Sequence, residues 1–94
     1  MPAVFHIPSP LRQFTEDRSS VQLDLSPNGS LRDALHSLFA VYPGLRDRIL
    51  TESGQLRQHV SVFIGKEDVR YTGGLTSVLP ANAEITIVPA ISGG

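Results

Sequence analysis

The sequence predicts an α+β domain in which a mixed sheet of four to five strands packs around one main helix. Several separate stretches alternate apolar and polar residues, which is typical of half-buried strands. One segment in the first half instead repeats its apolar residues at helical spacing. The chain has only 94 residues, which leaves room for one hydrophobic core.

Two strands are expected at the start of the chain. Residues 3–7 alternate, with Ala3, Phe5 and Ile7 on one face, and Pro8 ends the stretch. The segment that follows, up to Ser20, is polar and mixed and predicts a hairpin connection. Val21, Leu23 and Leu25 then alternate with polar residues, so a second strand is expected antiparallel to the first.

A helix is expected to begin at Ser30, after a Pro27-Asn28-Gly29 turn. Ser30 and Asp33 have the spacing of a capping box, with Asp in place of the usual Glu. Pro43-Gly44 ends the helix, and residues 45–50 suggest one further short helical turn. The apolar face is formed by Leu31, Leu35, Leu38, Phe39 and Tyr42.

The second half of the chain supplies the remaining strands. Residues 59–64 alternate, and a turn at Gly65-Lys66 leads to a short fourth strand at residues 69–71. Residues 75–79 suggest a single helical turn. The helical crossover predicts that the third strand runs parallel to one of its neighbours.

The last strand is expected to end at about Val88, which divides the chain into a domain at residues 1–88 and an extended tail at residues 89–94. The order of elements is strand, strand, helix, strand, short strand, strand. A mixed sheet around one helix in this order is the β-grasp, or ubiquitin-like, architecture.

Composition excludes several classes of function. Eight Lys and Arg residues face nine Asp and Glu residues, for a net charge of -1, so neither nucleic acid nor an anionic membrane is an expected partner. The chain has no cysteine, which excludes disulfides, thiolate metal sites and a cysteine nucleophile. There is no signal-peptide pattern, and the expected compartment is the cytoplasm.

The side chains do not form a recognisable active site. His6, His36 and His59 lack the spacing of metal ligands. The neighbouring carboxylates of Glu67 and Asp68 diverge and share no evident cleft. We therefore expect a protein that is not an enzyme and binds no metal or cofactor.

The segment with the clearest candidate chemistry is the C-terminal tail, which ends in two glycines. The tail consists of Pro89, Ala90, Ile91, Ser92, Gly93 and Gly94. Six extended residues reach about 20 Å, enough to bring the terminal carboxylate into another protein's active site. The two glycines have no Cβ, so the terminus is expected to fit through a narrow channel. A frayed end without a role is the plainer reading of the same residues.

Segments along most of the chain resemble the MoaD/ThiS family of ubiquitin-like sulfur carriers. Residues 30–35 and 42–45 look like the family's helix and the turn after it, and residues 67–70 and 73–75 look closest to the CysO-type carriers of cysteine biosynthesis. The sequence departs from the family at Ile64-Gly65-Lys66, where relatives often have an Asn or an Asn-Gly turn. The pattern is completed by Ile85 to Ile87, Pro89-Ala90 and Gly93-Gly94.

The resemblance implies chemistry at the terminal carboxyl group of Gly94. In the family, a ubiquitin-activating-type enzyme uses ATP and Mg²⁺ to adenylate the terminal glycine, and a sulfur donor converts it to a thiocarboxylate. The carrier is then a co-substrate that donates sulfur to an acceptor enzyme. Cysteine biosynthesis, with a cysteine synthase as acceptor, is the expected pathway. The alternatives are the small subunit of molybdopterin synthase, which binds a larger subunit, and a protein modifier that forms isopeptide bonds through Gly94.

Partner enzymes require a docking surface near the tail. If Val60, Val62 and Ile64 face the helix, Phe63 faces outward, and Val88 on the last strand lies near it. We expect Phe63 and Val88 to contact the activating enzyme, although isolated exposed apolar residues are also common on protein surfaces. Arg70 is expected either to meet an acidic partner surface or to pair with Glu67 or Asp68.

Overall fold

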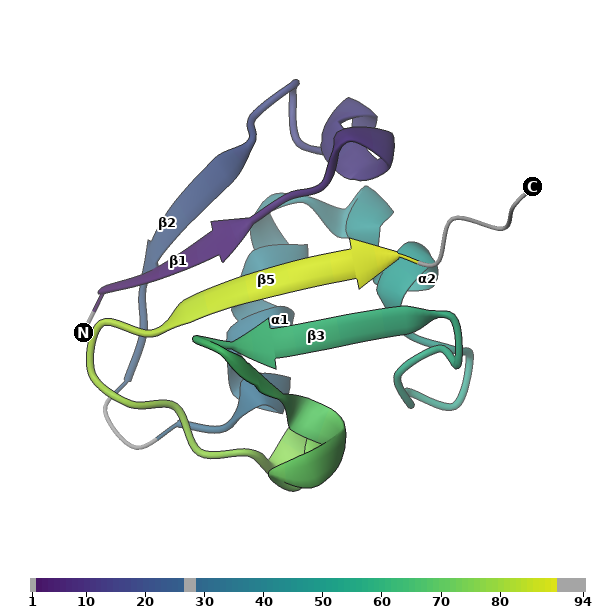
Figure 1. Ribbon diagram of the computed structural model, residues 1–94. Helices are drawn as coiled ribbons and strands as arrows, with labels where there is room; N and C mark the ends of the chain where they lie inside the picture. The colour runs from purple at the N-terminus through teal and green to yellow at the C-terminus, as the bar shows by residue number, and fades with distance from the viewer. Residues whose placement is uncertain (1, 27–28, 90–94) are drawn as a thin grey trace.

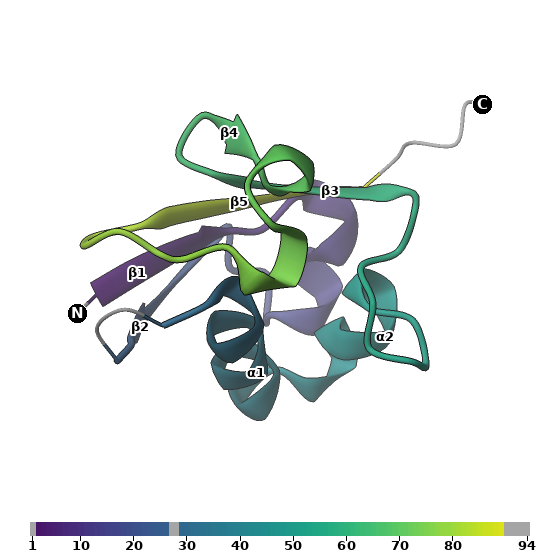
Figure 2. The same cartoon turned by 90° about the horizontal axis from the view of Figure 1, so that it is seen from below.

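A computed structural model describes residues 2–26 and 29–89. Five strands form one sheet, and Figure 2 shows both helices on the same side of it. The elements are β1 (Pro2–His6), β2 (Ser20–Asp24), α1 (Leu31–Val41), α2 (Arg46–Ile49), β3 (Val60–Ile64), β4 (Glu67–Asp68) and β5 (Glu84–Pro89). Short 3₁₀ turns occupy Ser9–Phe14, Pro43–Leu45, Val69–Tyr71 and Gly74–Thr76. No helix within the described ranges is long and apolar enough to cross a membrane.

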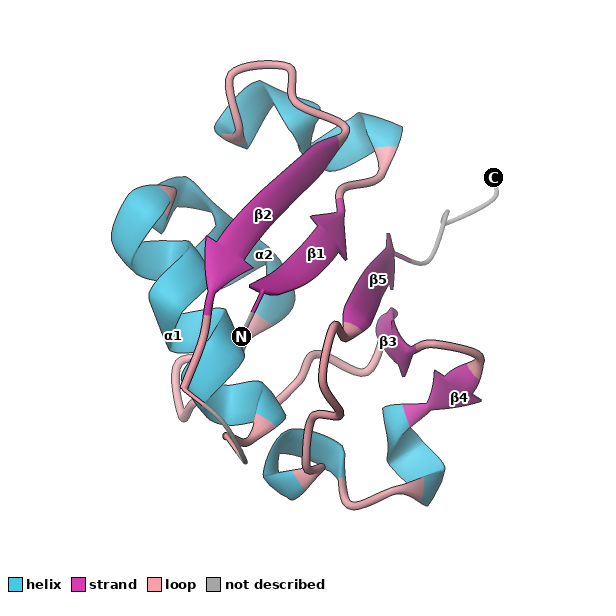
Figure 3. Ribbon diagram, turned by 90° about the vertical axis from the view of Figure 1, so that its left-hand side faces the viewer, coloured by secondary structure: helices cyan, strands magenta, loops and turns pink. Residues whose placement is uncertain are grey.

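The strand order is β2-β1-β5-β3-β4, so the last long strand lies in the centre of the sheet (Figure 1). β1 and β5 run parallel, and all other neighbours are antiparallel. The predicted mixed sheet is confirmed. The expectation that the third strand runs parallel to a neighbour is wrong, because β5 inserts between β1 and β3, and β3 is antiparallel to both β5 and β4 (Figure 3).

The start of α1 follows the predicted local chemistry. The Asp33 N–H donates to Ser30 Oγ at 3.2 Å, and the Ser30 N–H donates to Asp33 Oδ2 at 3.4 Å. Both halves of the capping box are therefore formed, and helical backbone N–H groups gain partners at the exposed end.

The core lies between α1 and the inner face of the sheet. Leu31, Leu35 and Leu38 on α1 are 0% exposed, as are Phe5 on β1 and Ile85 on β5. These side chains fill the space between the helix and the sheet. Burying each large apolar side chain stabilises the fold by about 1.5–3 kcal/mol. The strand that leads to the tail is thus held on its inner face by the core.

Two segments differ from the expected secondary structure. Residues 69–71 form a 3₁₀ turn rather than a strand, and the paired residues are Glu67 and Asp68. The cause is the Asp68 carboxylate, which accepts the Arg70 N–H at 2.9 Å and caps a turn that leaves the plane of the sheet. The helical turn expected at residues 75–79 is present one residue earlier, at Gly74–Thr76.

The connection between β1 and β2 is more ordered than its polar composition indicates. It forms a 3₁₀ turn at Ser9–Phe14, and Leu11 and Thr15 are buried. Thr15 Oγ1 donates to the Arg18 carbonyl oxygen at 2.9 Å. This connection closes the core at the end of the sheet where the β5 strand finishes.

Candidate docking face and tail exit

β5 leads to the C-terminal tail and finishes one residue later than expected. Pro89 is its last residue and pairs with Val60 at the start of β3. Pro89, which was predicted to be the first residue of the tail, therefore belongs to the sheet. The remaining tail residues, Ala90, Ile91, Ser92, Gly93 and Gly94, lie outside the described part of the chain, and their predicted role stays a prediction.

The end of β5 tolerates a proline because of its register. The Gly65 N–H donates to the Glu84 carbonyl oxygen at 2.8 Å, and the Val60 N–H donates to the Arg57 carbonyl oxygen at 3.0 Å, away from β5. Alternation along β3 therefore makes Val60 and Pro89 a pair that exchanges no ladder hydrogen bonds. The absence of an N–H at Pro89 therefore removes no hydrogen bond between β5 and β3.

The opposite side of β5 loses its partner before the strand ends. β1 pairs with β5 only at Glu84, Ile85 and Thr86. Pro8 then follows the end of β1 and has no N–H to donate. Within the described chain, Val88 and Pro89 therefore have a strand partner in β3 alone.

The outer face of the sheet near this end carries the predicted docking residues. Ile85 and Ile87 point into the core, so Thr86 and Val88 point outward. Val88 is 43% exposed and lies opposite Ser61. The predicted placement of Val88 on the outer face beside the tail is therefore observed, and its contact with a partner remains a prediction.

Phe63 also lies on the outer face, but it is half-buried rather than exposed. It sits on β3 between Thr86 of β5 and Asp68 of β4. Because Phe63 has a strand on each side and is only partly exposed, it offers a partner less area than a fully exposed ring would. Val88 is consequently the more exposed apolar residue of the two.

Arg70 reaches back across β3. Its Nη2 donates to Ser61 Oγ at 3.2 Å, and its backbone N–H donates to the Asp68 carboxylate. Within residues 2–26 and 29–89, the guanidinium forms no ion pair with Glu67 or Asp68, which argues against one of the two expected roles. Arg70 therefore places an exposed positive charge next to Ser61, opposite Val88.

Two exposed apolar side chains were not predicted from the sequence. Tyr71 is 86% exposed and Val78 is 68% exposed, and both lie near the short turns after β4. The exposure of Tyr71 was not predicted because residues 69–71 were expected to form a strand. For Val78, no feature of the sequence distinguishes an exposed valine from a core valine.

The polar groups of the described chain do not assemble a catalytic centre. His6 Nε2 lies 3.0 Å from Glu84 Oε1 on the exposed face of β1 and β5. No cluster of three or more metal-ligating side chains occurs in residues 2–26 and 29–89.

Comparison with protein families matches residues 5–94 to the ThiS family. The match includes the glycine pair at the end of the chain. It also covers the whole sheet apart from the first residues of β1.

Individual relatives agree with the family match. The chain is 33% identical to the sulfur carrier protein CysO of Mycobacterium tuberculosis over 90 residues, which is 94% of each chain. The crystal structure of that protein superposes with a TM-score of 0.81 over 95% of this chain and 99% of the other.

Two further relatives extend the comparison. The crystal structure of the BexX/CysO complex of Amycolatopsis orientalis contains a chain that is 27% identical, with a TM-score of 0.86 over 98% of this chain and 99% of that one. Small archaeal modifier protein 1 of Haloferax volcanii is 28% identical over 75 residues, or 80% of this chain and 82% of its own.

Proposed function

The chain belongs to the ThiS family, and on that premise we propose that this sulfur carrier is thiocarboxylated at Gly94 and donates its sulfur in cysteine biosynthesis. The observation that carries the proposal is the 33% identity to a sulfur carrier protein CysO across 94% of both chains. The position of β5 supports it, since the strand leads directly from the core to the tail.

The proposed chemistry takes place on the main chain. An adenylating enzyme of the ubiquitin-activating type binds ATP and Mg²⁺, and an oxygen of the Gly94 carboxylate attacks the α-phosphorus and releases pyrophosphate. A sulfur donor then attacks the carbonyl carbon, and the carbon–oxygen bond to AMP breaks. The product is a thiocarboxylate, whose sulfur is the nucleophile presented to the acceptor.

The carrier contributes presentation rather than acid–base catalysis. Its outer face at Val88 and Arg70 lies beside the last residue of β5, so an enzyme that takes up the tail also meets this face. In this scheme the protein is a co-substrate of its partners, which are the adenylating enzyme and a sulfur-accepting cysteine synthase.

The test is intact-mass spectrometry after incubation with ATP, Mg²⁺, the host's adenylating enzyme and sulfide. We expect a mass gain matching exchange of one oxygen for sulfur, localised to Gly94 by fragmentation. A chain lacking Gly93 and Gly94 is the control and should gain nothing. Failure of Gly94 to take up AMP or sulfur would refute the proposal.

A protein modifier is the second candidate function. The similarity to small archaeal modifier protein 1 favours it, and both functions begin with an acyl adenylate at the terminal glycine. An isopeptide link between Gly94 and a lysine of another protein, found in extracts of the host, would assign this function. Transfer of the thiocarboxylate sulfur to a cysteine synthase product, without such links, would assign the carrier function.

A further inference from the structure

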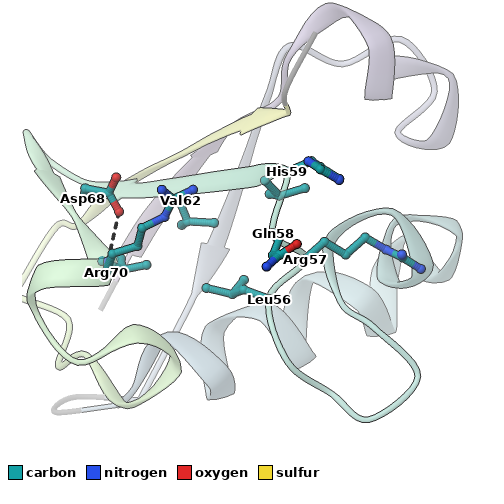
Figure 4. A pocket seen from close by; sticks show the side chains of 9 residues that line it. Leu56, Arg57, Gln58, His59, Val62, Asp68 and Arg70 are labelled. Carbon is teal, nitrogen blue, oxygen red and sulfur yellow. Dashed lines mark hydrogen bonds between the residues drawn. The ribbon is translucent and has the colours of Figure 1, made fainter. Parts of the chain in front are cut away.

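The two edges of the sheet differ in how far they are covered. One edge ends in β4, which is only two residues long. Beside the rest of β3 on that side, Val62 and Val69 are 0% exposed, and the side chain of Arg70 donates to Ser61 Oγ (Figure 4). The other edge is β2, which has five residues. Figure 3 looks onto this edge, and no helix or strand of the described chain lies in front of β2.

The backbone of β2 presents hydrogen-bonding groups at this edge. The Ile7 N–H donates to the Ser19 carbonyl oxygen at 2.8 Å, so Ser19 faces β1. Alternation turns the odd-numbered residues of β2 toward β1 and directs the N–H and C=O of Ser20 and Gln22 outward. Both residues are exposed. In the part of the chain that the structure describes, β2 pairs only with β1, and the backbone groups of these two residues form no hydrogen bond with a turn or loop.

The β2 edge lacks the features that usually prevent exposed strands from pairing. Proteins protect such edges with lysine, proline, a bulge or a very short strand. β2 contains no lysine and no proline, and its register with β1 is continuous from Ser20 to Asp24. The single charge of the strand, on Asp24, lies at its end.

We propose that β2 pairs antiparallel with β2 of a second copy of this chain, about a two-fold axis at Gln22. Only the register centred on Gln22 pairs all five residues of both strands. In this register Gln22 lies opposite the partner's Gln22, and the two residues exchange both backbone hydrogen bonds. Ser20 lies opposite the partner's Asp24.

The side chains of β2 are complementary to themselves in this register. A residue on the axis faces its own copy, so a charge there would repel, whereas the side-chain amide of Gln22 both donates and accepts hydrogen bonds. The Asp24 carboxylate faces a serine hydroxyl and not a second carboxylate. On the inner face, the half-buried side chain of Leu23 gains the partner's Val21 as a neighbour.

Pairing at β2 leaves the face beside the tail uncovered. β1 lies between β2 and β5, so Val88 stays exposed in the dimer. β5 runs antiparallel to β2, because β1 is parallel to β5 and antiparallel to β2. The two-fold axis therefore directs the two β5 strands toward opposite ends of one continuous sheet, and two partner enzymes can engage the two copies at once.

The test is a dilution series of the ¹⁵N-labelled full-length protein, followed by backbone amide hydrogen exchange. One strand pair buries less than the area of about 1,200–2,000 Å² that is usual for stable interfaces, so we expect a weak dimer. On dilution from about 1 mM to about 10 µM, the Gln22 amide should exchange severalfold faster. The Val21 amide faces β1 and is the internal control, which should not change. Exchange at Gln22 that is independent of concentration would overturn the proposal.

Charge variants on the axis test the register. Gln22→Lys and Gln22→Glu each place like charges opposite one another, and each should weaken dimerisation about fivefold in sedimentation equilibrium. An equimolar mixture of the two variants places lysine opposite glutamate and should restore association. Gln55→Lys, an equal change of charge in the exposed loop between α2 and β3, should leave dimerisation unchanged.

Two results from these variants and their partners would reject the two-fold pairing. One is a mixture of Gln22→Lys and Gln22→Glu that associates no better than either variant alone. The other is protection of the Gln22 amide that appears only when the adenylating enzyme is added, which would assign the edge to that enzyme. The measurements need no activation of Gly94, so their outcome is independent of sulfur loading.

Discussion

Replacing Val88 by aspartate tests whether the outer face of β5 docks the adenylating enzyme. Fully burying a valine side chain is worth about 1.5–3 kcal/mol. Val88 is 43% exposed, so complete burial in an interface contributes about 0.6–1.3 kcal/mol. Losing that contribution alone lowers the kcat/KM of the adenylating enzyme for this protein about three- to ninefold. A carboxylate left without a partner in the interface adds about another tenfold or more, for an expected total loss of about thirty- to ninetyfold.

The fold should tolerate this change. Val88 lies opposite uncharged Ser61, and the Arg70 guanidinium is bonded to that serine, so a carboxylate at position 88 meets no like charge. Phe63→Asp is less informative, because it would set a carboxylate directly opposite Asp68 and destabilise the strand pair.

The assay is pyrophosphate release by the host's adenylating enzyme, measured as a function of carrier concentration. The matched control is Val41→Asp, since Val41 is 52% exposed at the end of α1, and α1 packs on the opposite face of the sheet from Val88 (Figure 2). Circular dichroism should show both variants folded. If Val88→Asp reacts as well as Val41→Asp and the unchanged protein, Val88 is outside the interface and the docking hypothesis fails.

Four further substitutions test the fold that supports this face. Ser30→Ala removes the side-chain half of the capping box and should cost about 1 kcal/mol, seen as a drop in Tm of about 4–8 °C. Gly73→Ala should lose about 1–3 kcal/mol in urea unfolding, because φ is +114° and the new Cβ would lie 3.0 Å from Thr76 Oγ1. Gly54→Ala, with φ +84° and open space around it, should lose less, and equal losses would contradict the steric part of this explanation. Leu35→Ala should cost about 2–5 kcal/mol, as its side chain is 0% exposed; an unchanged midpoint in urea would place Leu35 outside the core.

Features set by local chemistry could be predicted from the sequence. The Ser30–Asp33 capping box, the end of the helix at Pro43 and the alternating inner residues of β5 depend on neighbours within a few positions. The sheet topology could not be fully predicted, because insertion of β5 between β1 and β3 depends on contacts across most of the chain.

At the candidate site, too, features set by neighbouring residues could be predicted and features set by distant contacts could not. Val88 on the outer face follows from alternation along one strand. The extent of β4 could not be predicted in this way, because the Asp68 side chain accepts the Arg70 N–H and starts a 3₁₀ turn where a strand was expected.

The central position of β5 has a mechanical consequence. A partner that draws the tail into a deep channel pulls along the axis of this strand. Because β3 pairs with β5 up to Pro89 and β1 pairs with its first half, a pull along the strand axis loads both ladders in shear instead of breaking hydrogen bonds one after another. Tension applied at the end of β5 is therefore shared by several hydrogen bonds, which keeps the sheet intact while a partner holds the tail.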